Sequence, residues 1–189
     1  MSERLYSGSN VPQEAVTFGV PVINSDHEAI HLKYGYSLSR YAEGVADDAF
    51  LYVELKTPTV ASGKIVHLKV WRPWGEGGLN SMEVVEAPTF TTGSTSIIAN
   101  IQNRNRYGDD VATAMQLAKS DPTSISVGTV IDGPVLFGGG GAGGGSGGSL
   151  SNDQELVLEQ NTTYIIRLKN LSGAAKAMGI WLFWYEENR

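Results

Sequence analysis

Residues 27–31 (His-Glu-Ala-Ile-His) match the H-E-x-x-H pattern of zinc peptidases. On a helix, the two histidines of this pattern lie on one face and bind one zinc ion, while the glutamate activates a bound water. From Ile30 to Leu38, however, apolar residues alternate with polar ones, which is typical of a half-buried strand. Four residues of a strand span about 13 Å, whereas two nitrogens on one zinc lie within roughly 4 Å of each other. The sequence therefore predicts a chance match on a strand.

A catalytic zinc site also needs a third protein ligand. The only other histidine is His67, inside a second predicted strand, and Tyr34 stands where the longer H-E-x-x-H-x-x-G-x-x-H motif has glycine. A zinc peptidase that uses His27 and His31 is the remote enzyme alternative.

Residues 138–149 contain nine glycines, and this run matches both the phosphate-binding pattern G-x-G-x-x-G and the nucleophile pattern G-x-S-x-G. The first pattern needs a helix directly after it and the second a strand-to-helix turn, but the chain continues as Leu-Ser-Asn-Asp at 150–153. The run has no charged, aromatic or amide side chain. We therefore predict a flexible surface loop without a catalytic role.

Adjacent carboxylates occur three times along the chain. On a strand, neighbouring side chains point to opposite faces, so such pairs cannot act together as general acid and base. We interpret them as solvated turn or terminal charges. The pairs are Asp47-Asp48, Asp109-Asp110 and Glu186-Glu187.

The composition excludes several classes of site and partner. The 189 residues include no cysteine, which rules out disulfides and thiolate chemistry. The net charge of −6 argues against a nucleic-acid or anionic-membrane partner. No apolar run approaches the roughly 18 residues of a membrane span, and residues 1–10 lack the apolar core of an export signal. We expect neither a nucleic acid nor a membrane as partner.

Short alternating or β-branched runs dominate the chain. About nine or ten strands without a long helix predict an all-β sandwich or barrel. Residues 110–119 fit a helix and a strand equally well. Residues 1–20 show no sustained period of apolar residues and are predicted to form an extended arm. The rest of the chain, residues 21–189, is predicted to form a single domain. Strands are predicted at residues 30–38, 50–56, 65–71, 82–87, 96–102, 127–131 (continuing to 137), 155–158, 163–170 and 180–185.

Residues 71–78 (WRPWGEGG) place Trp and Arg at the tip of a predicted hairpin. In one interpretation Trp71 closes the core and Trp74 folds back over it. In the other, Arg72 and Trp74 form a partner-binding anchor, because Trp and Arg dominate interface hot spots.

Several segments also follow one another in a familiar order. They are HEAIHLKYGY (27–36), VEAPTFTT (85–92), NRNR (103–106), DPT (121–123), the glycine run, LEQNTTYIIRLKN (158–170) and WYE (184–186). In that order they resemble the capsid decoration (cement) proteins of tailed bacteriophages, over about residues 20–187.

This resemblance implies a jelly-roll-like antiparallel β-sandwich that assembles as a homotrimer. It places the protein on the outer surface of the virion, bound to the major capsid protein at joints between its subunits. It implies neither catalysis nor a cofactor, and it makes residues 110–119 a strand.

The predicted arm carries apolar residues spaced to dock on a partner. Its periodic apolar surface is too small to offset about 1–2 kcal/mol per residue of backbone ordering, so we expect it to order only on the capsid. The alternative is a receptor- or glycan-binding module of a phage head or tail fibre, with exposed aromatic platforms such as Trp74 and Tyr107. The docking residues are Leu5, Tyr6, Val11, Val16 and Phe18.

Overall fold

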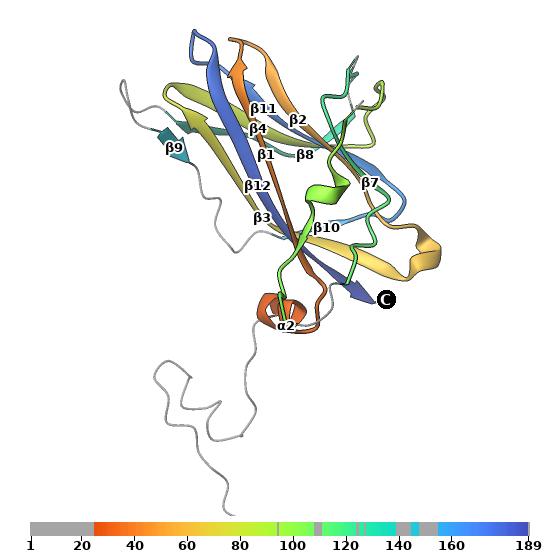
Figure 1. Ribbon diagram of the computed structural model, residues 1–189. Helices are drawn as coiled ribbons and strands as arrows, with labels where there is room; N and C mark the ends of the chain where they lie inside the picture. Colours follow the sequence, from red (N-terminus) through yellow and green to blue (C-terminus); the bar gives the residue numbers. More distant parts are fainter. Residues whose placement is uncertain are drawn as a thin grey trace, which may run out of the picture.

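The computed structural model describes residues 25–93, 95–107, 111–123, 125–126, 128–138, 145–147 and 155–188. Within them, two antiparallel β-sheets pack face to face, and a short helix, α2 (Ser25–His31), lies at one end of the sandwich (Figure 1). The predicted all-β sandwich is therefore confirmed. The predicted arm, residues 1–20, lies outside the described residues.

Each sheet has six strands. Sheet A contains, in order, β10 (Leu156–Leu158), β3 (Lys64–Glu76), β12 (Lys176–Asn188), β1 (Gly35–Val45) and β6 (Gln102–Asn103), and β9 (Gly145–Gly147) also pairs with β3. Sheet B contains, in order, β5 (Thr95–Ser96), β7 (Leu117–Ser120), β2 (Phe50–Lys56), β11 (Thr163–Asn170), β4 (Leu79–Glu86) and β8 (Thr129–Gly138).

The strand order is that of a jelly roll. Sheet A has β1, β12, β3 and β10 as consecutive neighbours, and sheet B has β2, β11, β4 and β8. The chain passes from one sheet to the other at nearly every connection between these eight strands, which is the double Greek-key arrangement of this fold. The predicted jelly-roll-like fold is present.

One hydrophobic core fills the space between the sheets. In β2, alternation directs Leu51, Val53 and Leu55 inward, where each is at most 2% exposed. Burying a side chain of this size contributes about 1.5–3 kcal/mol to folding. The largest fully buried side chains are Trp71, Trp184, Tyr36, Tyr164, Leu38, Leu51, Leu55, Leu68, Met82, Ile165, Ile166 and Leu168.

The prediction of a strand at residues 27–31 is wrong, because these residues belong to α2. The helix ends in a Schellman arrangement: Tyr34 N–H donates to Ala29 O, Lys33 N–H donates to Ile30 O, and Lys33 has a left-handed φ of 66°. Strand β1 begins only at Gly35. The apolar alternation that starts at Ile30 therefore spans a helix end and a strand start.

Residues 87–128 form an insertion between β4 and β8 that reaches both sheets. Its strand β6 pairs with β1 at one edge of sheet A, and its strand β7 pairs with β2 in sheet B. The predicted strand at 96–102 is mostly wrong, since Ile98–Asn100 form a 3₁₀ turn. Of the ambiguous residues 110–119, residues 111–115 are irregular and 117–119 lie in strand β7. The insertion thus covers the open edges of the sheets on one side of the sandwich.

Two parts of this insertion cross the outer face of sheet B. Thr91 and Thr123 form an antiparallel bridge, and Ser126 N–H donates to Thr89 O. The Glu54 side chain points outward from β2, and Thr92 and Gly93 donate hydrogen bonds of 2.8–2.9 Å to it. The crossing segments therefore lie against the outer face, and Glu54 is only 2% exposed.

The glycine run is only partly described. Gly138 ends β8, and Gly145–Gly147 form β9, which pairs with Trp74–Glu76 of β3. These residues of the predicted loop therefore lie in strands. Residues 139–144 and 148–149 lie outside the described residues.

Candidate partner-binding surface

Strand β3 places the two predicted anchor residues on the outer face of sheet A. Alternation along the strand turns Trp71 inward, where it is 1% exposed, and turns Arg72 and Trp74 outward. The predicted position at a hairpin tip is wrong, because β3 continues to Glu76 and the turn is made by Gly77 and Gly78, both with positive φ. Trp71 closes the core, in agreement with the first of the two interpretations of residues 71–78.

Trp74 forms an aromatic pair with Tyr41 of β1. The ring centroids are 5.9 Å apart, and the two side chains are 38% and 50% exposed. Gly179 of β12 is the register partner of both residues, and a Cβ on Gly179 would lie 3.6 Å from Tyr41 Cδ2 and 3.8 Å from Trp74 Cε3. The two rings therefore cover the space above a glycine in the middle strand, which fixes an exposed aromatic platform on a rigid sheet.

Two residues further along β12, at the next outward position, two arginines lie over Trp181. The guanidinium carbons of Arg72 and Arg104 are 5.2 Å and 5.7 Å from its ring centroid, within the range of cation–π attraction. Trp181 is also stacked on Phe183, with 6.3 Å between centroids and an interplanar angle of 11°. Arg72 comes from β3, while Arg104 follows β6, so the arginines reach Trp181 from different strands.

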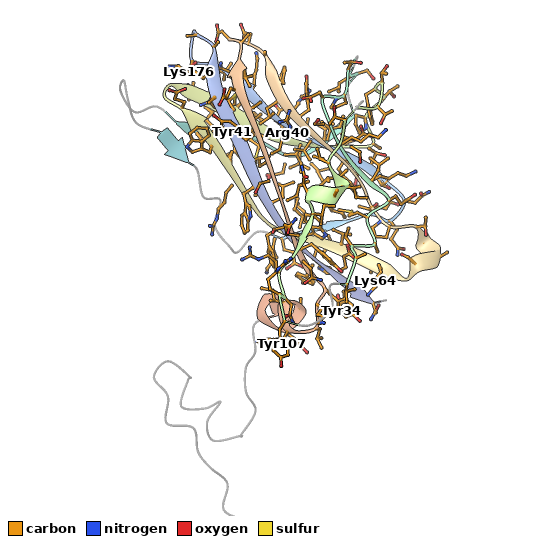
Figure 2. The ribbon with its side chains drawn as sticks, viewed as in Figure 1. Tyr34, Arg40, Tyr41, Lys64, Tyr107 and Lys176 are labelled. Atoms are coloured by element: carbon orange, nitrogen blue, oxygen red, sulfur yellow. The ribbon has the colours of Figure 1, made fainter. Side chains whose placement is uncertain are left out.

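The structure does not bring all the predicted contact residues together. Figure 2 shows Tyr107 beside α2 at one end of the sandwich and Tyr41, the partner of Trp74, toward the other end. Tyr107 is 89% exposed, but it does not share a platform with Trp74. The arm residues lie outside the described part of the chain; they are Leu5, Tyr6, Val11, Val16 and Phe18.

A charged cluster that the sequence analysis did not find lies on the same outer face. His67 Nδ1 contacts Glu155 Oε1, Lys69 Nζ lies 3.0 Å from Glu155 Oε2, and Tyr185 OH donates to Glu155 Oε1 over 3.0 Å. His67 Nε2 lies 3.1 Å from Glu187 Oε2 without hydrogen-bond geometry. Both ring nitrogens therefore face carboxylates, and the imidazole stacks on Tyr185 at 4.5 Å.

The pKa of Glu155 reflects this cluster. Partial burial raises it, but the hydrogen bonds from His67, Lys69 and Tyr185 outweigh burial and lower the pKa below its ordinary value. Only pairing across strands creates the cluster, since Glu155 and His67 are far apart in sequence. We interpret the cluster as a set of interactions that holds β10 against β3 and β12.

Glu186 corrects the prediction that adjacent carboxylates are solvated, because it is only 2% exposed. Its carboxylate accepts hydrogen bonds from the Thr113 hydroxyl, from Ala114 N–H at 2.9–3.1 Å and from Trp184 Nε1 at 3.4 Å. Burial raises its pKa above the ordinary value, although these donors oppose the shift. Glu186 thus holds residues 113–114 of the insertion against sheet A.

Helix α2 gives residues 27 and 31 the i, i+4 spacing of a zinc motif, contrary to the strand argument. Within the residues that the structure describes, however, no three His, Asp or Glu side chains are arranged to hold a metal ion. In the same ranges, no helix is long and apolar enough to cross a membrane.

The outer face of sheet A is therefore the best-defined candidate surface: an exposed Trp–Tyr pair beside a tryptophan that carries two arginines. Comparison with protein-family models, curated proteins and solved structures finds no match to this chain.

Proposed function

We propose that this protein is a non-enzymatic capsid decoration (cement) protein of a tailed bacteriophage. It binds the outer surface of the expanded head and stabilises joints between subunits of the major capsid protein. We further propose that it binds as a homotrimer.

The observation that carries this proposal is the jelly-roll strand order, in which β1-β12-β3-β10 faces β2-β11-β4-β8. This fold recurs in viral capsid and lectin domains. The sequence resemblance adds to it, because segments from residue 27 to residue 186 follow the order found in decoration proteins. Fold and resemblance together favour a binding protein of the virion.

The proposed mechanism is selective binding. A protein that binds only the expanded lattice stabilises it by RT ln(1 + [L]/Kd), about 2.7 kcal/mol per site at a hundredfold excess over Kd. In a trimer the second and third contacts form at high effective concentration, so the assembly dissociates slowly. Residues 1–20, which precede α2 in the sequence, serve as the main anchor in this proposal.

The test is to add the purified protein to undecorated heads of the phage whose genome encodes it. Expanded and unexpanded heads are compared by sedimentation and by electron cryomicroscopy. We expect saturable binding to expanded heads, with density at the local symmetry axes, and little binding to unexpanded heads. Failure to bind expanded heads contradicts the proposal.

A matched pair of variants tests the face of sheet A as a capsid contact. Trp74→Ala and Leu136→Gln each remove an exposed apolar side chain, 38% and 61% exposed, from β3 and from β8. With the arm as main anchor, both variants retain head binding. A loss for Trp74→Ala alone would make the Trp74 surface the capsid contact.

The second candidate function is a receptor- or glycan-binding module of a phage head or tail fibre. The exposed Trp74–Tyr41 pair favours it, because exposed aromatic rings on a β-sheet can stack on the apolar face of a sugar ring. Binding to host cells without binding to expanded heads would favour this function over the first.

A further inference from the structure

We propose that the outer face of sheet A binds an acidic saccharide, a sugar chain that carries carboxylate groups. The binding residues are Arg72, Trp181 and Arg104, called here the Trp181 site. This inference goes beyond capsid decoration, and it does not depend on it.

The first observation is that the two guanidinium groups of the Trp181 site have no carboxylate partner within the described part of the chain. Elsewhere in the described chain, Arg40 pairs with Asp121 at 3.3 Å and Arg167 pairs with Glu83. Within the same ranges, neither Arg72 nor Arg104 has an ion pair, although the protein carries a net charge of −6. Two exposed cations at one tryptophan ring, without an anion among the described residues, favour an anionic ligand.

The second observation is that an aromatic surface lies between these cations. Trp181 is half-buried, and its ring stacks on that of Phe183, which is only 6% exposed. The sheet therefore fixes the position of the Trp181 ring. Its register partner on β1 is Ser39, whose exposed side chain is small and carries a hydroxyl. The Trp74–Tyr41 pair covers Gly179, the next outward position along β12.

These features fit a sugar better than a protein partner. A sugar ring presents a C–H face to an exposed aromatic pair, here Trp74 and Tyr41, and polar groups at its rim. A carboxylate on that rim accepts paired hydrogen bonds from a guanidinium. The aromatic surface continues for two register steps, from Trp181 to the Trp74–Tyr41 pair, which suits consecutive units of a chain. Jelly rolls are also a common lectin fold.

The test uses the whole protein and three carboxylated probes: oligogalacturonate, alginate oligomers and polysialic acid. A neutral galactan oligomer of the same length as the oligogalacturonate is the matched ligand control. Binding is measured by titration calorimetry at low and at physiological salt. We expect at least one acidic probe to bind, more weakly at the higher salt, and the neutral oligomer to bind at least about tenfold less tightly.

Variants tie the binding to the site. We expect Arg72→Gln with Arg104→Gln to lower affinity for the acidic probe by at least about tenfold, since two charge-assisted contacts are lost. Arg40→Gln removes an arginine that is paired with Asp121 and should leave binding unchanged. Because Trp181→Ala removes a half-buried ring, its thermal unfolding is measured beside Trp181→Phe, which keeps a ring and is expected to keep binding.

Results other than those expected would overturn the inference. The most direct is that none of the three acidic probes binds. If the neutral oligomer binds equally tightly, the aromatic platform alone accounts for binding and the arginines have no role in it. If the double arginine variant instead loses binding to expanded heads while no saccharide binds, the Trp181 site is a protein interface. In that case the proposal that the parent protein decorates heads would still hold.

Discussion

Glu186 is stable in the interior because three groups direct hydrogen-bond donors at its carboxylate: Thr113, Ala114 and Trp184. Burial still disfavours the charged form, and its pKa is raised. A carboxyl group with a higher pKa in the folded than in the unfolded state binds more protons when folded. Its contribution to stability is therefore most favourable below the unfolded pKa and declines as pH rises through the folded pKa.

We predict that Glu186→Gln removes this decline. Glutamine resembles the protonated carboxyl, so the free energy of unfolding of the variant, relative to the parent, should rise between about pH 4 and pH 7. Urea unfolding at several pH values measures it, with Glu28→Gln, whose side chain is exposed on α2, as control. A difference that does not change with pH would contradict the assignment.

The histidine pair on α2 is testable by metal content. Catalytic zinc needs three protein ligands. The third histidine of the chain, His67, lies in β3 and contacts Glu155. We therefore predict sub-stoichiometric zinc in the parent protein and no change in His27→Ala with His31→Ala, measured by elemental analysis. One zinc per chain in the parent, lost in the variant, would instead support the zinc peptidase alternative.

At the scale of elements, the predictable parts are strands whose whole length lies inside a sheet. β2 and β11 have the predicted bounds, 50–56 and 163–170, because each is a short run rich in aromatic and apolar residues that lies between two neighbouring strands. α2 was missed because Ile30 and Leu32 keep a period of two across a helix end. The insertion was misread because short strands at sheet edges depend on partners distant in sequence.

The candidate surface could be predicted from the sequence only where its residues lie on one strand. Arg72 and Trp74 are two positions apart on one strand, so a shared face follows from their spacing. Trp181 and Arg104 join them only through sheet pairing, which sequence spacing does not reveal. The burial of Glu186 likewise depends on residues 113–114, which belong to the insertion.

Gly93 provides a prediction about the crossing segments. A Cβ at this position would lie 2.1 Å from the Ser120 carbonyl oxygen, and that backbone is held in β7. Gly93→Ala should therefore destabilise the protein by about 1–3 kcal/mol, measured by thermal or urea unfolding. Thr89→Ala is the control, because Thr89 is exposed and contributes its backbone carbonyl to Ser126. Equal stability of the two variants would show that the segment is not fixed against β7.

For the whole molecule, the proposed anchor and the sandwich should be separable. We predict that removal of residues 1–19 leaves the thermal unfolding and the oligomeric state unchanged, because the core is built from residues that follow α2. Attachment to expanded heads should weaken by tenfold or more, about 1.4 kcal/mol. If the truncated protein binds heads with unchanged affinity, the anchor is instead the face that carries Arg72 and Trp74.

The position of β12 has a consequence for how the molecule is made. This last strand lies between β3 and β1 in sheet A and pairs with both along most of its length. During synthesis, β1 and β3 leave the ribosome before the strand that separates them, and their apolar faces stay incompletely covered until residues 176–188 follow. Sheet A therefore forms only after β12 has been made, and a chain that stops before Lys176 lacks the strand that joins the two halves of the sheet.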